Sequence, residues 1–166
     1  LREIDTALQD PPGIGPLQLK YYFIEMYACQ AMTFLHSGEI VKAHAALACA
    51  WETRKGLDAA VPLQDANIAR GQALNDLYRL EAALVRNDIQ HVPGWRSASR
   101  HSITSLLRLS AKVPHHRVEA LKLKGVHCWM LGRQREALNS WRAAIDTGKR
   151  LNARLPLART CFEVGK

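Results

Sequence analysis

Two stretches of this 166-residue sequence, residues 31–51 and 125–145, align with each other without a gap. Matched residues, most of them small, stand at a constant offset of 94 positions: Ala31 with Gly125, Gly38 with Gly132, Ala43 with Ala137, Leu47 with Trp141 and Ala50 with Ala144. Half of this offset, 47 residues, is about the length of two helices with their connection. An internal repeat of this kind predicts stacked helical hairpins, because each hairpin needs a neighbour to cover its apolar side.

The spacing of apolar residues indicates helices throughout. The chain is rich in Ala, Leu and Arg, and no stretch shows the sustained alternation of apolar and polar residues that is typical of strands. We therefore predict an all-α fold, a right-handed superhelical array of antiparallel hairpins with about seven helices. The predicted helices are residues 17–36, 39–56, 63–87, 95–112, 115–131 and 133–151, with a last helix from about 154.

Residues 1–16 are interpreted as the end of a preceding helix followed by a Pro/Gly linker, because the motif DPPGIGP cannot continue a helix. Residues 17–166 are predicted to form one helical repeat domain, with hairpins at 17–56, 63–112 and 115–151 and the start of a further helix at 154–166. The chain begins with Leu1 rather than Met, and its last residues keep helical periodicity. We therefore expect a piece of a longer protein.

The matched small residues are explained by contact between helices. Where the two helices of a hairpin cross, a side chain larger than a methyl group holds them apart, so Gly or Ala is expected there. Gly38 and Gly132 permit the left-handed conformation that closes a hairpin. Three tryptophans are predicted on core stripes and a fourth is the one candidate for an exposed ring: Trp51, Trp129 and Trp141, then Trp95.

The four cysteines are far apart, each in a helical pattern among apolar neighbours: Cys29, Cys49, Cys128 and Cys161. This spacing disfavours a zinc site or a redox motif and predicts buried, reduced thiols, so we expect a cytoplasmic location. The most apolar stretch, YYFIEMYACQAMTFL, has 15 residues and contains Glu25 and Gln30. It is too short and too polar for a membrane span, and no secretory signal is recognisable.

Residue types that catalyse reactions or bind metals do not group in the sequence. Adjacent His115 and His116 are interpreted as exposed residues at a helix start, and Asp65 and Asp76 as parts of a solvated helix. The other histidines of interest have no acidic or cysteine partner at ligand spacing: His44, His101 and His127. We predict that this region is not an enzyme and holds neither a metal nor a cofactor.

Positive charge is concentrated in the second half of the chain. Residues 1–90 carry 8 basic and 11 acidic side chains, whereas residues 91–166 carry 15 basic and 4 acidic ones. The predicted fourth helix has a basic stripe at steps of four or eight residues, formed by Arg96, Arg100, Arg108 and Lys112. The stripe is either a solvated outer face or a surface for an anionic partner.

Residues 121–149 resemble the tetratricopeptide signature, which alternates large and small residues over two helices. Five residues match it in type or size: Leu121, Gly125, Cys128, Ala137 and Trp141. Lys124 and Lys149 stand where Leu and Pro are expected. The first hairpin matches through Tyr27, Ala31, Phe34, Ala43 and Leu47, and departs at Gln30 and Lys55.

The last 42 residues or so are similar to the helical-repeat segments of large bacterial signalling proteins. In those proteins a regulatory ATPase module precedes such repeats, and a cyclase, kinase or transcription-regulating domain is linked to them. The resemblance implies a regulatory scaffold and no catalytic residue in this region.

We therefore expect protein–protein recognition or intramolecular regulation, with the first helices of the hairpins lining a concave surface. Candidate contact residues there are Tyr21, Glu25, Arg70, Lys122 and Lys124. Two alternatives stay open, a nucleic-acid-binding module that uses the basic half, and a small-molecule pocket between hairpins. The partner is expected to be another domain of the same chain or a separate, acidic protein, and a homo-oligomer is a further alternative.

Overall fold

The computed structural model describes residues 15–57 and 60–165, which form α-helices joined by short connections and contain no strand. Most of the predicted segment 1–16 therefore lies outside the described residues. The helices are α2 (Pro16–His36), α3 (Ile40–Lys55), α4 (Pro62–Val85), α5 (Val92–Leu109), α6 (Arg117–Met130), α7 (Gln134–Arg150) and α8 (Arg154–Val164), with a 3-10 turn at Pro114–His116. The all-α prediction is confirmed.

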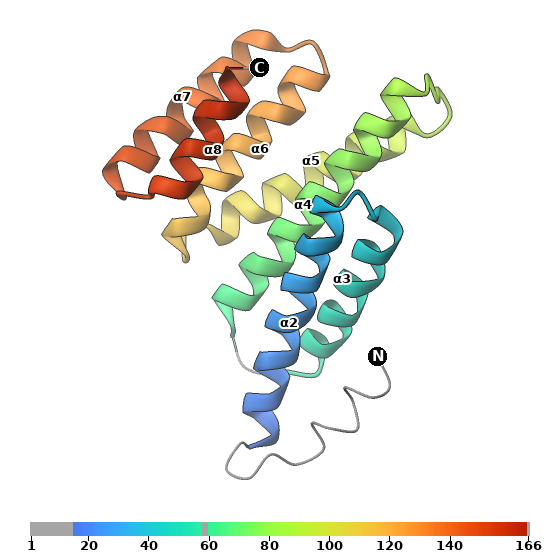
Figure 1. Cartoon of the computed structure of the whole chain (residues 1–166), viewed down its shortest axis with the longest axis vertical. Coiled ribbons are helices and arrows are strands. Elements are labelled where there is room, and N and C mark those ends of the chain that lie inside the picture. Colours follow the sequence, from blue (N-terminus) through green and yellow to red (C-terminus); the bar gives the residue numbers. More distant parts are fainter. Residues whose placement is uncertain (1–14, 58–59, 166) are drawn as a thin grey trace.

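The helices pack in neighbouring pairs, α2 with α3, α4 with α5 and α6 with α7 (Figure 1). Helix α4 also packs on α2 and α3, while α6 contacts α4 and α5, so each hairpin leans on the next one. Helix α8 covers α7 and α6. Figure 1 shows the hairpins in chain order, with the α4–α5 pair crossing between the other two.

Small residues lie where the helices of a hairpin meet. Ala43 and Ala137 are fully buried, and a Cβ added to Gly125 would lie 2.2 Å from Nε1 of Trp141. Gly38 and Gly132 close the first and third hairpins with φ of 76° and 73°, the left-handed region that glycine tolerates. The matched pattern at the 94-residue offset is therefore a pattern of close helix contacts.

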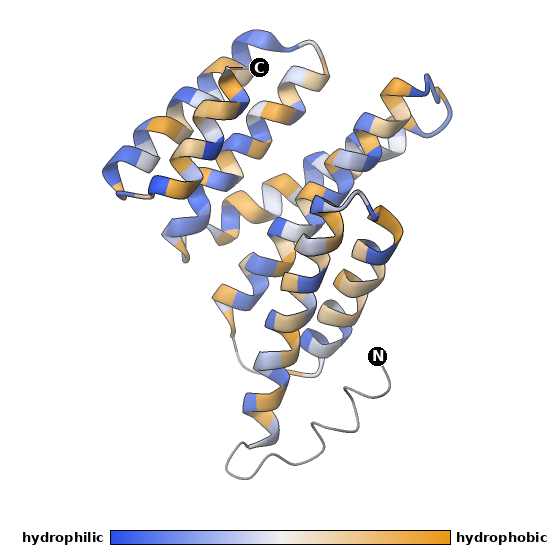
Figure 2. Ribbon diagram, in the orientation of Figure 1, coloured by the Kyte–Doolittle hydropathy of each residue, from blue (hydrophilic) through white to orange (hydrophobic). Residues whose placement is uncertain are grey.

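Apolar clusters join one hairpin to the next. Ile24, Ala50 and Ile68 pack together between the first two hairpins, and Leu77, Leu106 and Leu123 form a cluster shared by the second and third. Figure 2 shows that every helix carries both apolar and polar residues. The core therefore runs along the array.

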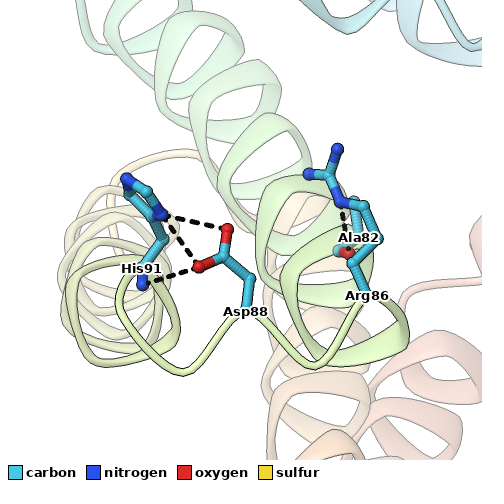
Figure 3. A network of polar contacts seen from close by, with 4 residues as sticks. All are labelled: Ala82, Arg86, Asp88 and His91. Atoms are coloured by element: carbon cyan, nitrogen blue, oxygen red, sulfur yellow. Dashed lines mark hydrogen bonds and ion pairs between the residues drawn. The ribbon is translucent and has the colours of Figure 1, made fainter.

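Helix α5 begins at Val92, three residues before the predicted start, and ends at Leu109 instead of 112. Pro93 fits the first turn of this helix, because a backbone N–H at that position would have no partner within the helix. Asp88 holds the connection that precedes the helix (Figure 3). The Asp88 carboxylate accepts hydrogen bonds from the His91 backbone N–H at 3.2 Å and pairs with Nδ1 of the His91 ring at 2.9 Å. These contacts lower the pKa of Asp88, the ring contact most of all.

Several expectations about single side chains are wrong. Of the four cysteines only Cys128 is buried, because the other three lie on outward faces of α2, α3 and α8. Trp51 and Trp129 are 49% and 50% exposed instead of lying in the core, and Trp95 is half-buried against Arg79. The exposure of these side chains depends on how the hairpins pack on one another, which the periodicity within one helix does not specify.

Two ionisable residues expected in solvent are also buried. His116 lies beneath the turn before α6, and Asp76 faces α5 from α4. Both are covered because α4 contacts helices on two sides.

Candidate functional site

An open groove of about 1020 Å³ lies between α3 and α5, with α4 as its floor. The second helices of the first two hairpins form its walls. We call it the α3–α5 groove. It lies apart from the concave surface that the sequence analysis expected on the first helices.

The α3 wall of the groove has an apolar part, formed by Leu47, Ala48 and Trp51, beside the polar and charged residues His44, Glu52, Arg54 and Lys55. Trp51 presents a half-exposed indole, and Leu47 lies buried beneath it against Gly71 of α4. A Cβ at Gly71 would lie 2.7 Å from Cδ2 of Leu47, so glycine permits this close approach of α3 to α4. The wall therefore offers an aromatic ring on a firmly packed base.

The floor of the groove is an apolar patch between polar residues of α4. Ile68 and Ala69 follow Asp65 and are followed at helical spacing by Gln72, Asp76 and Arg79. Asp76 is only 4% exposed and accepts a hydrogen bond of 2.8 Å from Nε2 of Gln72.

The pKa of Asp76 is raised, because burial disfavours its charged form. Hydrogen bonds from Ser102 and Gln72 and the charge of Arg79 oppose this effect. The Asp76 carboxyl group thus finds its hydrogen-bond partners within the α4–α5 hairpin, and its low exposure leaves little of it accessible to a molecule in the groove.

The α5 wall combines an arginine–tryptophan stack with small residues. The Arg79 guanidinium lies 4.8 Å from the centre of the Trp95 ring. Its Nε is buried and has no hydrogen-bond partner among the residues that the structure describes. Further along the wall, His101 and Arg108 are exposed on either side of Ser105, which leaves room between them.

Ion pairs neutralise the opposite end of the groove. Arg54 binds both carboxylate oxygens of Asp65, and Lys55 contacts Glu52 at 2.8 Å. The pairing with Asp65 raises the pKa of Arg54, mainly through the hydrogen bond. Free positive charge is therefore left on the α5 side.

A second cavity, of about 200 Å³, lies on the side of the first helices, between α2, α4, α6 and α8. Lys122 and Glu119 form an ion pair of 2.8 Å there, and Nε of Arg70 is buried with no hydrogen-bond partner within residues 15–57 and 60–165. Burial lowers the pKa of nearby His116 to about 4, with the charges of His115 and Arg70 acting in the same direction. This cavity is small because side chains from four helices converge on it.

The structure separates the predicted contact residues. Arg70 and Lys122 line the small cavity, while Tyr21 packs on the first apolar cluster and Glu25 accepts hydrogen bonds from Nδ2 of Asn67 at 2.8 and 3.0 Å. Lys124 is exposed on α6 and lines neither cavity.

The predicted basic stripe is divided as well. Each step of four residues turns about 40° around a helix, so the stripe winds from one side of α5 to the other. Arg108 borders the groove, whereas Arg96 and Arg100 lie toward His127 of α6, and Lys112 follows the end of the helix. Burial lowers the pKa of His127, and the charges of Arg133, Arg96 and Arg100 lower it further.

A pocket between hairpins was one of the alternatives that the sequence left open, but the sequence did not indicate where it lies or which residues line it. The residues that shape it most are Trp51, Asp76, Arg79 and Trp95. One signal was present, because Gln72, Asp76 and Arg79 bring polar groups to one side of α4 between small and apolar residues. It did not show which neighbour this side faces.

Comparison of the chain with protein-family models, with curated proteins and with solved structures found no match. Within the described residues, no group of three His, Cys, Asp or Glu side chains is placed to hold a metal ion. A search of the same residues for a helix with the length and apolarity to cross a membrane found none.

Proposed function

We propose that this chain is a non-catalytic interaction module that binds a segment of a protein partner in the α3–α5 groove. One observation carries the proposal: an open groove of about 1020 Å³ has a half-exposed tryptophan on its α3 wall and two arginines across from it, Arg79 on the floor and Arg108 on the α5 wall. Grooves between helices accept the apolar face of a partner helix. The partner segment belongs to another domain of the same protein or to a separate protein.

Trp51 is the expected anchor of this contact. Tryptophan is enriched among the few residues that carry most of the binding free energy at protein interfaces. Its ring is 49% exposed in the free chain and lines the groove, so a bound segment would bury apolar area there. The packing of Leu47 beneath it keeps this wall in place.

The test is a panning experiment with a display library of random 16-residue peptides, followed by anisotropy measurements on the enriched sequences. We expect Trp51→Ala to weaken binding by at least about tenfold, as loss of an interface anchor does. Trp129→Ala is the matched control, because Trp129 is equally exposed but lies outside the groove. Failure to enrich any peptide, or equal binding by the Trp51 variant, would contradict the proposal.

Nucleic-acid binding is the second candidate, and one observation favours it. Arg96, Arg100 and Arg133 all act on His127, which places three positive charges in one region of the α5–α6 surface. Phosphate binding would lose affinity steeply as salt rises. Titration of a 20-base-pair duplex at low and moderate salt tests it, and no binding even at low salt would remove it.

A further inference from the structure

We infer that the segment bound in the α3–α5 groove is an acidic amphipathic helix, with carboxylates toward the α5 wall and its apolar face on Trp51. This inference rests on the proposed function, since it names the chemistry of the partner at the same groove. Four features of the groove carry it, namely its charge balance, the stacked guanidinium of Arg79, its dimensions and its apolar wall.

The charge balance of the groove is positive on one side. Seven acidic or basic side chains line it besides two histidines, namely Arg54, Lys55, Arg79, Arg108, Glu52, Asp65 and Asp76. Two ion pairs cancel near the C-terminal end of α3, Arg54 with Asp65 and Lys55 with Glu52. The remaining carboxyl group, Asp76, is buried, its pKa is raised, and the charge of Arg79 acts on it. Positive charge is therefore in excess on the side of Arg79 and Arg108.

Arg79 is prepared for a carboxylate. Its guanidinium is stacked on the Trp95 ring, which limits its rotation, and its buried Nε lacks a hydrogen-bond partner in the described part of the chain. A buried donor without an acceptor is costly, and a planar guanidinium binds a carboxylate through two parallel hydrogen bonds. Because Nε itself is closed to solvent, a partner carboxylate would pair with the charge of the stacked guanidinium and not with this atom.

The dimensions of the groove suit a short helix. Its α5 wall extends from Trp95 to Leu109, a length of roughly 20 Å at 1.5 Å per residue. A partner helix of about 14 residues has the same length. Arg79 lies beside Trp95, while Arg108 lies at the other end of this wall, so carboxylates several turns apart on one face of the partner would meet both.

The apolar wall distinguishes this partner from a nucleic acid. Trp51, Leu47 and Ala48 offer little to a sugar–phosphate backbone, and the ion pairs of Glu52 and Asp65 leave no excess positive charge on that side for a continuous polyanion. An amphipathic helix brings an apolar face to Trp51 and an acidic face to the arginines on the α5 side, so both sides of the groove have a complementary partner.

The test uses the sequences that the peptide library yields. We expect them to be enriched in Glu and Asp together with Leu, Ile or Phe at helical spacing. For one such sequence, versions with Glu, Gln or Lys at the polar positions are synthesised, and their binding is measured by anisotropy. The Glu version should bind at least about tenfold tighter than the Gln version at low salt, and this ratio should shrink as salt screens the charges.

Variants of the chain locate the contact. Arg79→Gln should lower affinity for the Glu peptide about tenfold and Arg108→Gln about threefold, since Arg108 is the more exposed. Arg135→Gln removes the same charge from an exposed position of α7 outside the groove and should change nothing. Circular dichroism of each variant checks that the helices are retained.

The outcomes separate this inference from the proposed function. If no peptide is enriched, the proposed function fails and the inference with it. If peptides bind in a Trp51-dependent way but the Glu, Gln and Lys versions bind alike, the groove is an interaction site and the inference alone is overturned. Displacement of the Glu peptide by a 20-base-pair duplex that binds more tightly would also overturn it.

Discussion

At the scale of single residues, Gly125 leaves the least room for a side chain among the glycines of the described chain, because it lies against Trp141. A methyl group at Gly125 would meet three atoms of the rigid indole, at 2.2, 2.3 and 2.8 Å. We expect Gly125→Ala to lower the free energy of unfolding by about 1–2 kcal/mol, because overpacking outweighs the gain of about 1 kcal/mol in helix propensity. Chemical denaturation measures this.

Two other glycines provide the controls. Gly71→Ala should cost less, since its Cβ meets the flexible end of Leu47, and Gly94→Ala should be neutral or stabilising, because nothing lies within 4 Å of its added Cβ. A Gly125→Ala variant that is as stable as the wild type would show that the third hairpin does not depend on this close contact.

The buried His116 makes stability depend on pH. Its pKa of about 4 in the folded chain lies below the ordinary value of 6.5, so the unfolded chain takes up a proton that the folded chain does not. The free energy of unfolding therefore falls as the pH is lowered through this window. From about pH 7 to about pH 5 this residue accounts for a loss of about 2 kcal/mol.

The check is denaturation of His116→Gln at both pH values. This variant should lose about 2 kcal/mol less than the wild type over that range. His44→Gln, at an exposed position of α3, should keep the full loss. An identical pH dependence in all three proteins would mean that His116 is charged in the folded chain.

At the scale of helices, the start of α5 depends on one carboxylate. Asp88 binds both the backbone N–H and the ring of His91, ahead of Val92. We expect Asp88→Ala to speed amide hydrogen exchange at His91 and in the first turn of α5, because the residue directly before this turn loses the acceptor that holds it in place. Asp146→Ala, at an exposed position within α7, should leave exchange there nearly unchanged.

The Asp88 contact also has a pH dependence. Its pKa is lowered in the folded chain, so its stabilising effect is present above the ordinary carboxylate range and is lost as the pH falls through the lowered pKa. Equal exchange in wild type and Asp88→Ala at neutral pH would show that the helix starts without it.

Most helices were predictable because their signal is local. The repeated pattern predicts that Ala43 and Ala137 lie where two helices cross. Both residues are fully buried in the structure. The start of α5 was misplaced because Pro93 and Gly94 resemble a loop, although proline fits the first turn of a helix. Local patterns thus specify helices better than their ends.

The groove was not predictable, because it arises between hairpins. Trp51 fits a core stripe on α3, and Asp76 fits a solvated face on α4, if each helix is considered alone. The exposure of Trp51 and Asp76 depends on where α5 lies relative to α3. The periodicity within one helix gives no information about that position. Of the predicted contact residues, Arg108 alone borders the groove.

At the scale of the whole molecule, each hairpin packs mainly on the next one. Arrays of this kind derive their stability from each unit and from the interface with its neighbour. Helices α2 and α3 pack on each other and on α4, whereas α6 and α7 pack on each other and, through α6, on α4 and α5. A substitution that destabilises one terminal hairpin should therefore leave the stability of the other terminal hairpin unchanged.

Two matched substitutions test this locality. Ala43→Leu and Ala137→Leu each place a larger side chain at a fully buried crossing, with an expected cost of about 1–3 kcal/mol. Hydrogen exchange should rise in α2 and α3 for the first variant and in α6 and α7 for the second, with the other hairpin keeping its protection. If hydrogen exchange instead rises uniformly along the chain in both variants, the seven described helices unfold as one cooperative unit. The α3–α5 groove could then not open or change without the other helices.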